Sequence, residues 1–307
     1  YSKSYLHRAI IAASLSNGES VINNVTLSKD IEATIEAFRK LGATITLKDN
    51  SLIIKGIKDF NSVLSMSINC NESGSTLRFL IPLSLVISQE AEFTGKGRLL
   101  SRPQSVYEEL FEEKGCSLKK RENSLTASGE LKSGTYKVRG DVSSQFLTGL
   151  LFTLPLLEGD SEIVLTTKLE SAPYVDITID VLSKFGVNVT KTENGFFIKG
   201  SQKYKSSAIT TEGDWSNAAF LDAFNLVGGS VAVRGLNIDS FQGDKIYREF
   251  YDNLSCDNPQ FDISDCPDLG PVLITCAVLK HGALIKGTNR LKIKESDRGQ
   301  AMAQELK

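Results

Sequence analysis

Hydrophobic and polar positions along the chain recur in one common order. Five segments begin with small or polar residues and continue into an apolar stretch of helical length, and most of them then pass through a glycine-type break into a β-rich strand. The five segments are SKSYLHRAIIAASLSNGESVINNV, SGSTLRFLIPLSLVISQEAEFTG, VSSQFLTGLLFTLPLLEGDSEIVLT, DWSNAAFLDAFNLVGGSVAVRG and CPDLGPVLITCAVLKHGALIKGT. Self-similarity of this kind indicates repeated supersecondary modules.

The starts of these segments are regularly spaced. Counted from Ser4, Ser75, Ser144, Ser216 and Asp268, the offsets between successive segments are 71, 69, 72 and 52 residues. Three nearly equal offsets in succession are not a chance pattern. We therefore expect the segments to occupy equivalent positions in equivalent modules.

A second shared part follows in the first three copies. It is an amphipathic helix that ends in a glycine, as in DIEATIEAFRKLGA, SVYEELFEEKGC and DITIDVLSKFGV. Gly42, Gly115 and Gly186 stand where helix C-caps are expected. A short strand pair with turn signals follows, as in VNVTKTENGFFIKG. Each copy therefore predicts a β-α-β-α-β-β module, and the chain as a whole predicts an α+β fold.

The modules divide into two groups. Residues 1–212 hold three copies and are predicted to form a complete domain, whereas residues 213–307 hold two copies and are predicted to form an incomplete second domain. The fourth copy returns through the short segment CDNPQFDIS, and the fifth stops inside its second helix, DRGQAMAQELK. A module without its closing strand pair leaves apolar surface uncovered. The sequence therefore predicts a chain truncated at both ends, with a natural five-module protein as the alternative.

Composition narrows the class of protein. A chain of 307 residues is too long for one compact core, and 41% hydrophobic with 23% charged residues is an ordinary soluble balance. The net charge of -2 gives no indication of nucleic acid or an anionic membrane. Five cysteines without a CxxC pair, beside only two histidines, favour reduced thiols in a cytosolic protein and argue against a zinc site. The longest apolar stretch, FLIPLSLVI, is too short to cross a bilayer.

The polar starts of the apolar helices are candidate binding positions. A helix N-terminus carries unpaired N–H groups and a partial positive charge, and it therefore attracts anions. Serine and aspartate are also good N-caps, so capping alone is an alternative for any single copy. Long polar side chains beside three of these starts favour anion binding. They are Lys3 and Arg8 in the first copy, Arg78 in the second and Gln145 in the third.

Charged residues also precede the amphipathic helices. Arg102 lies before the helix of the second copy, where a cation is unfavourable unless an anion offsets it. The equivalent place in the fifth copy is LKIKESDR, residues 291–298. We interpret Lys294 and Arg298 as anion ligands and Glu295 as a group that transfers protons.

The same octapeptide predicts a strand that runs into a helix. Leu291 and Ile293 alternate with lysines, which is typical of strand residues. Asp297 suits the start of the following helix, and helix capping explains it.

Seven motifs in this order resemble the 5-enolpyruvylshikimate-3-phosphate synthase family of enolpyruvyl transferases. They are SKSYLHR, SGSTLR, SRP, GDVSSQFL, SAPYVDIT, DCPDLGP and KESDR. The resemblance covers essentially the whole chain. It implies a two-domain enolpyruvyl transferase fold with an active site in the cleft between the domains, and six βαβαββ modules, of which five are present here and the last is incomplete.

The resemblance also implies a reaction. The family transfers the enolpyruvyl group of phosphoenolpyruvate to the 5-hydroxyl of shikimate 3-phosphate and releases phosphate, in the shikimate pathway to chorismate. Such a site has to hold two phosphates and a carboxylate, deprotonate a hydroxyl and protonate a methylene carbon. These two small-molecule substrates are the implied partners, with no nucleic acid, membrane, cofactor or metal. A cytoplasmic monomer is expected.

Residue roles are implied by matching the motifs of the family. The implied catalytic residues are Asp268 as the base near the 5-hydroxyl, Glu295 as the partner that protonates and deprotonates the methyl carbon, and Lys3 as a further proton carrier. The implied ligands of shikimate 3-phosphate are Ser4, Arg8, Ser143, Ser144, Gln145, Ser171, Tyr174, Asp268 and Lys294. The implied ligands of phosphoenolpyruvate are Lys3, Gly74, Arg102, Gln145, Glu295 and Arg298.

Two alternatives stay open. The related transferase that acts on UDP-N-acetylglucosamine shares the repeat, but its first motif has Lys-Asn where this chain has Lys3-Ser4, and it usually carries a cysteine in the loop that here reads GKGRLLSRP. The second alternative is an inactive fragment that binds shikimate 3-phosphate without turnover. One motif departs from the family, because Glu72-Ser73 precede Gly74 where many members have Asn-Ala or Asn-Ser.

Overall fold

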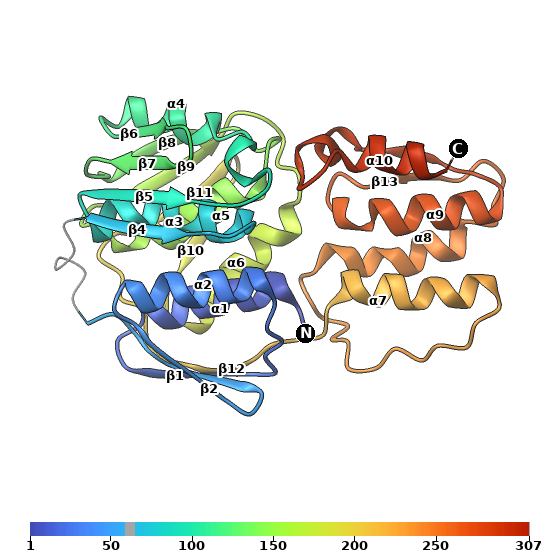
Figure 1. Cartoon of the computed structure of the whole chain (residues 1–307), viewed down its shortest axis with the longest axis horizontal. Coiled ribbons are helices and arrows are strands. Elements are labelled where there is room, and N and C mark those ends of the chain that lie inside the picture. The colour runs from blue at the N-terminus through green and yellow to red at the C-terminus, as the bar shows by residue number, and fades with distance from the viewer. Residues whose placement is uncertain (59–64, 307) are drawn as a thin grey trace. The chain divides into compact units, whose positions relative to one another are not determined.

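A computed structural model describes residues 1–58 and 65–306 of the chain. These residues fold as two units, which differ in architecture (Figure 1). The first unit contains Tyr1, Lys3–Leu169 and Val175–Thr211, and the second contains Ser2, Glu170–Tyr174 and Glu212–Lys307.

The third module of the first unit shows the predicted β-α-β-α-β-β order most simply. Its sheet has the order β10-β11-β9-β8, in which β8 and β9 are parallel and the other pairs are antiparallel. Parallel neighbours need a crossover, and α5 provides it. The elements are β8 (Gly134–Val138), α5 (Ser144–Thr153), β9 (Ser161–Leu165), α6 (Ala172–Lys184), β10 (Val189–Thr192) and β11 (Gly195–Ile198).

The second module has the same topology. Its sheet has the order β4-β5-β7-β6, again with one parallel pair joined by a helix. The elements are β4 (Ser65–Asn69), α3 (Gly74–Ile87), β5 (Glu90–Thr94), α4 (Ser105–Glu113), β6 (Ser117–Lys120) and β7 (Leu125–Ser128). Two short 3₁₀ helices, η2 (Leu99–Ser101) and η3 (Leu154–Leu156), complete the second and third modules.

The first module takes its first strand from the far end of the unit. Strand β12 (Ala208–Thr210) pairs in parallel with β1 and so occupies the place that β4 and β8 occupy in the other sheets. No strand was expected from the sequence at residues 208–210. The other elements are α1 (Lys3–Leu15), β1 (Glu19–Asn23), α2 (Lys29–Lys40), β2 (Thr44–Lys48) and β3 (Ser51–Lys55).

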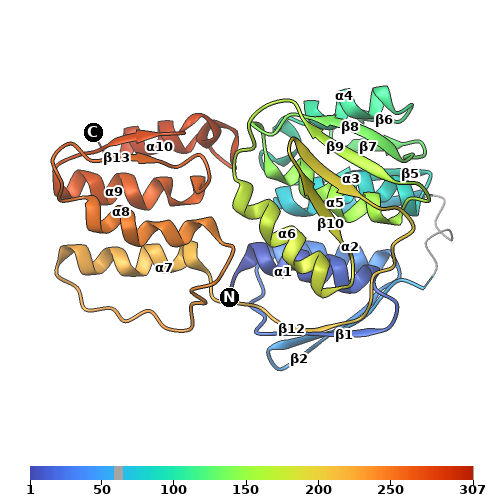
Figure 2. The same ribbon diagram turned by 180° about the vertical axis from the view of Figure 1, so that it is seen from behind.

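Helices α1, α3 and α5 are buried along almost their whole length. Figures 1 and 2 show them in the interior of the unit with the sheets around them. A helix that is apolar on all sides is suited to such a position. By contrast, α2 is amphipathic and buries one face through Ile31, Ile35 and Phe38. The predicted C-cap glycines are confirmed, since Gly42, Gly115 and Gly186 have φ values of +98°, +72° and +77°.

The second unit packs short helices over a two-stranded parallel sheet of β13 and β14. Its core holds Trp215, Tyr247, Phe261 and Leu273, each less than a tenth exposed. The elements are α7 (Trp215–Asp222), η4 (Ala223–Val227), η5 (Gly243–Ile246), α8 (Tyr247–Asn253), β13 (Gln260–Asp262), η6 (Pro267–Leu269), α9 (Gly270–Lys280), β14 (Leu284–Lys286), η7 (Asn289–Ile293) and α10 (Arg298–Glu305).

Two strands predicted in this unit were wrong. Residues 229–235 of the fourth copy, all of them described, are not a strand. The Asn225 side chain donates to the carbonyl of Val231 and accepts from its N–H, at 2.9 and 2.7 Å, and so takes the place of a neighbouring strand. Leu291 and Ile293 lie in the 3₁₀ helix η7 instead of a strand, because Leu291 turns inward and packs beside Gly270 in the core.

Close packing of α5 against α3 makes Gly149 sensitive to substitution. A Cβ at this position would lie 2.5 Å from the carbonyl oxygen of Arg78 and would also overlap the hydroxyl of Tyr107. We expect Gly149→Ala to lower the free energy of unfolding by about 2 kcal/mol, as overpacking in a core does. Urea denaturation followed by circular dichroism measures this change.

The matched control is Gly299→Ala near the start of α10, where a Cβ would lie 3.6 Å from the nearest atom, Oδ1 of Asp297. Alanine favours the helix there, so stability should stay equal or rise by less than about 1 kcal/mol. An unchanged denaturation midpoint for Gly149→Ala would contradict the packing described.

Candidate active site

The helix starts singled out from the sequence are helix N-termini in the first unit. Ser73 caps α3, since its Oγ accepts the N–H of Thr76 at 3.1 Å, and Ser143 caps α5, since its Oγ accepts the N–H of Gln145 at 3.3 Å. Helix α1 begins one residue before Ser4. Ser73 and Ser143 therefore serve as helix caps. Whether these helix starts can bind an anion depends on the side chains beside them.

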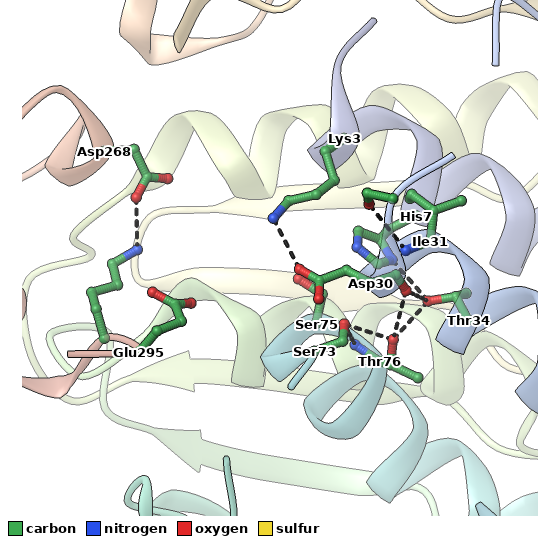
Figure 3. Close-up of polar contacts among 12 residues, drawn as sticks. Lys3, His7, Asp30, Ile31, Thr34, Ser73, Ser75, Thr76, Asp268 and Glu295 are labelled. Carbon is green, nitrogen blue, oxygen red and sulfur yellow. Dashed lines mark hydrogen bonds and ion pairs between the residues drawn. The ribbon is translucent and has the colours of Figure 1, made fainter. Parts of the chain in front are cut away.

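A buried chain of hydrogen bonds ties α1, α2 and α3 together (Figure 3). Nδ1 of His7 lies 2.8 Å from Oγ1 of Thr34, which lies 2.7 Å from Oγ1 of Thr76. The Thr76 hydroxyl in turn donates to Oγ of Ser73 at 2.7 Å. This chain fixes the starts of α1 and α3 relative to each other. Burial, and then the positive charges of Lys3 and Arg8, hold the pKa of His7 well below its ordinary value.

Lys3 lies at the exposed edge of this arrangement. Its ammonium pairs with Oδ2 of Asp30 on α2 at 2.9 Å, and its side chain keeps 54% of its surface exposed (Figure 3). The predicted proton carrier is thus accessible and held by a carboxylate. Sequence analysis did not single out Asp30, because nothing in the first turn of an amphipathic helix distinguishes a functional carboxylate from one that suits the helix dipole.

Arg102 fills the space in front of Gly74. A Cβ at Gly74 would lie 3.0 Å from Cζ of Arg102 and would overlap one of its guanidinium nitrogens. Arg102 itself is buried, at 8% exposure. The absence of a side chain at the start of α3 therefore lets a guanidinium approach the helix N-terminus. Both are positive, so the pair forms a place where an anion is favourable.

Two hydrogen bonds hold Gln145 next to the start of α3. Its Oε1 accepts from Nη1 of Arg78 at 2.9 Å, and its Nε2 donates to Oγ of Ser75 at 3.1 Å. Arg78 also donates to the carbonyl of Pro103 at 2.9 Å, directly after Arg102. The sequence predicted Arg78 as an anion-binding side chain. In the structure it is buried, and its hydrogen bonds hold Gln145 and the loop that carries Arg102.

Arg8 is buried at 2% exposure and crosses from α1 to two other helices. Its Nε donates to Oγ1 of Thr178 at 2.8 Å, and its Nη1 donates to the carbonyl of Ser4 at 2.7 Å. A weaker bond of 3.4 Å joins its Nη2 to Oγ1 of Thr148. These hydrogen bonds to neutral oxygen atoms hold the predicted ligand in place.

The second unit builds a separate cluster around Asp268. Oδ1 of Asp268 pairs with Nζ of Lys294 at 3.2 Å and with Nη1 of Arg298 at 2.7 Å. Tyr174 donates to Oδ2 at 2.9 Å. Burial opposes ionisation of Asp268, but Lys294, Arg298 and the hydrogen bonds outweigh it and hold its pKa below the ordinary value. Asp268 is therefore a carboxylate at neutral pH.

Glu295 joins this cluster from the solvent side. Its Oε2 pairs with Nη2 of Arg298 at 3.0 Å, and 58% of its side-chain surface is exposed. Arg298 thus holds two carboxylates with one guanidinium. The predicted set of Asp268, Glu295, Lys294 and Arg298 lies together, although the 3₁₀ helix η7 takes the place of the strand that was expected before Lys294.

Ser171 has a partner that the sequence did not reveal. Nη1 of Arg290 donates to its Oγ, and its Oγ lies 3.4 Å from the carbonyl oxygen of Ser264. Arg290 is buried and also lies 3.9 Å from a carboxylate oxygen of Glu170. A lone arginine in a β-rich stretch gives no sequence signal for such a role. The same holds for Asp244, which lies 3.2 Å from the Tyr174 hydroxyl.

Known proteins resemble this chain over its whole length. The whole chain, residues 1–307, matches the EPSP synthase (3-phosphoshikimate 1-carboxyvinyltransferase) family. The chain belongs to this family. The 3-phosphoshikimate 1-carboxyvinyltransferase of Clostridium kluyveri is 47% identical over 99% of this chain and 76% of its own length. That of Clostridium perfringens strain SM101 is 44% identical over 99% of this chain and 77% of its own length.

A solved structure supports the EPSP synthase fold. The EPSP synthase from Acinetobacter baumannii has a TM-score of 0.77 with this chain at 21% sequence identity, covering 99% of this chain and 76% of that one. At this identity the likeness concerns the fold alone. The predicted α+β, two-domain enolpyruvyl transferase fold is confirmed.

Two features are absent from the part of the chain that the structure describes. Residues 1–58 and 65–306 contain no group of three or more His, Cys, Asp or Glu side chains that could hold a metal ion. Over the same residues, no helix has the length and apolar character needed to span a membrane.

The lowered pKa of His7 predicts a pH-dependent stability. The unfolded chain binds a proton at this histidine below about pH 6.5, whereas the folded chain does not, so stability is lost as the pH falls. We expect the free energy of unfolding to drop by up to about 1.4 kcal/mol per pH unit below that value. His7→Asn should reduce this slope, as measured by urea denaturation across pH.

Replacing the other histidine, the exposed His281, controls for the substitution itself. If His7→Asn and the parent chain show equal slopes, the buried neutral state of His7 is wrong.

Proposed function

We propose that this chain transfers the enolpyruvyl group of phosphoenolpyruvate to the 5-hydroxyl of shikimate 3-phosphate and releases phosphate. The observation that carries the proposal is the cluster around Asp268. It sets one ionised carboxylate beside a lysine and an arginine, and the same arginine holds Glu295. Two carboxylates and two cations in one place fit a reaction that binds anions and moves protons. Relatives at 44–47% identity carry the name of this activity.

The proposed ligands of shikimate 3-phosphate come from both units. In the first unit, the buried Arg8 carries a positive charge, and the N-terminus of α5 favours an anion. In the second unit, Tyr174 and Lys294 flank the proposed base. The full set is Ser4, Arg8, Ser143, Ser144, Gln145, Ser171, Tyr174, Asp268 and Lys294.

The proposed ligands of phosphoenolpyruvate centre on Gly74 and Arg102. A guanidinium that approaches a helix N-terminus gives the concentrated positive charge that a phosphate or carboxylate needs. Gln145 and Lys3 lie on the neighbouring helix starts of the same unit. The second unit supplies Glu295 and Arg298.

The same charges regulate the proposed base. Lys294 and Arg298 hold Asp268 ionised but also make it a weak base. When these two cations turn to anionic substrates, their charge is offset and the basicity of Asp268 rises. Asp268 can then accept the proton of the 5-hydroxyl, while Glu295 and Lys3 serve the methyl carbon. The base is thus activated only when substrate is bound.

The two alternatives are distinguished by substrate. The chain carries Lys3-Ser4 and no cysteine in GKGRLLSRP, and its curated relatives favour the shikimate reaction over that on UDP-N-acetylglucosamine. We further propose that the domain boundary lies near residue 212, and that the protein acts as a cytoplasmic monomer. Release of phosphate from phosphoenolpyruvate that requires shikimate 3-phosphate tests the main proposal. Release that requires UDP-N-acetylglucosamine would replace it.

The role of Glu295 is tested by Glu295→Gln. We expect turnover to fall by ~10²-fold or more, because the amide cannot exchange a proton with the methyl carbon. Affinity for shikimate 3-phosphate, measured by calorimetry, should change little. Glu305→Gln is the matched control, since Glu305 is an exposed carboxylate at the end of α10. Equal turnover of parent and Glu295→Gln would remove Glu295 from the mechanism.

The role of Arg102 is tested through Gly74→Ala. The added methyl displaces the guanidinium, which is the flexible end of a side chain, so the fold should persist. We expect the KM for phosphoenolpyruvate to rise about tenfold or more, since a misplaced charge binds its anion weakly. The KM for shikimate 3-phosphate is the internal control and should change much less. Equal increases in both values would show a general distortion and contradict the assignment.

A further inference from the structure

The hydroxyl of Tyr174 lies between two carboxyl groups of the second unit. Its oxygen is 2.9 Å from Oδ2 of Asp268 and 3.2 Å from Oδ2 of Asp244. A phenol carries one proton and can donate it to only one of them. The other carboxyl oxygen then faces a lone pair of the phenol, which is unfavourable unless that carboxyl carries a proton of its own.

Asp268 is the acceptor of the tyrosine proton. Lys294 and Arg298 both contact its Oδ1, so it is ionised and can only accept hydrogen bonds. The shorter distance from Tyr174 also favours Asp268. Asp244 is left to donate to the phenol oxygen, and it can do so only as a neutral carboxylic acid.

The surroundings of Asp244 favour this neutral form. The residue lies in η5 and is 2% exposed. Burial raises the pKa of Asp244, and the negative charges of Asp268 and Asp214 raise it further. Hydrogen bonds from the hydroxyls of Ser216 and Tyr174 lower the pKa, but by less. The other charged or titratable neighbours, Lys245 and Cys266, do not favour the ionised form of Asp244.

Lys245 follows Asp244 in the same 3₁₀ helix, but its ammonium donates to the carbonyls of Ile238 and Ser240, at 3.3 and 2.9 Å. Cys266 faces Asp244 from the turn before η6, and burial, followed by the negative charge of Asp244, raises the pKa of this thiol, so it is neutral. Lys294 and Arg298 contact Asp268, and Arg290, which also interacts with Asp268 and Tyr174, donates to Ser171.

We propose that Asp244 is a positioning residue of the reaction, which as a neutral acid donates to Tyr174 and thereby fixes the tyrosine proton on Asp268. The inference rests on the proposed function, in which Tyr174 and Asp268 bind shikimate 3-phosphate. Ionised Asp244 would compete for the tyrosine proton and repel Asp268. The geometry of the shikimate side is therefore retained at low pH and lost as the pH rises through the pKa of Asp244.

Asp244→Asn separates this role from simple packing. Asparagine has the same shape, stays neutral at every pH and offers its Nδ2 as a donor to Tyr174. We expect affinity for shikimate 3-phosphate, measured by calorimetry near pH 7, to stay within about threefold of the parent. The parent should lose affinity at higher pH, and the variant should lose less. The same alkaline loss in both proteins would overturn the proposal.

Asp244→Leu removes the donor and keeps the bulk. We expect it to bind shikimate 3-phosphate about tenfold or more weakly than the parent at every pH. Equal affinity of the leucine variant and the parent would show that the hydrogen bond to Tyr174 has no positioning role. Should the leucine variant fail to fold, the comparison of parent and asparagine variant still decides the matter.

Infrared spectroscopy gives a readout that needs no substrate. A protonated carboxyl group absorbs apart from carboxylates, and the pKa of Asp244 is raised to about 7. The parent near pH 6 should therefore show a carboxylic acid band that Asp244→Asn lacks. Absence of this band in the parent overturns the proposal. A parent chain that shows the band but binds no shikimate 3-phosphate would instead contradict the proposed function, so the two failures are distinguishable.

Discussion

Burial of α1, α3 and α5 on every side is the constraint on which the first unit depends. Polar side chains along such helices need partners in the core, as His7 and Arg8 on α1 have in Thr34 and Thr178. The starts of these helices add a further requirement, because four N–H groups of each helix need partners there. Serine caps, the His7–Thr34–Thr76–Ser73 chain and the guanidinium of Arg102 all gather there. The packing of the helices thus gathers positive charge and donors at these ends, where an anion is favoured.

The second unit holds its polar residues in place mainly through contacts among their side chains. Its sheet has two strands of three residues, so its polar residues are held by one another more than by a scaffold of long helices. Asp268 is the centre of this network, with cations on one oxygen and a phenol on the other. Taking a carboxylate partly out of water is costly unless such partners compensate it. The network therefore offsets the cost of burying Asp268 and keeps it ionised at the same time.

The sequence predicted features that recur periodically along the chain. It missed contacts between residues that are far apart in the sequence. Modules, buried helices, C-cap glycines and the cluster of Asp268 with Lys294, Glu295 and Arg298 follow from repeat and motif. Residues 229–235 do not form the strand expected in the fourth copy, because the side chain of Asn225 bonds to the backbone of Val231, and no periodicity reveals such a competitor. Asp30, Asp244 and Arg290 were missed because each acts on a residue at least 27 positions away. The ligand assignments remain predictions.

Strand β12 has a consequence for the order in which the chain can fold. It pairs with β1, which precedes it by nearly the whole length of the unit. During synthesis the second and third modules can each close their own sheet, but β1 keeps an unpaired edge until residues 208–210 have left the ribosome. The first module made is thus the last to be completed. Contacts of such long sequence separation slow folding, and they also join the two ends of the unit so that neither frays alone.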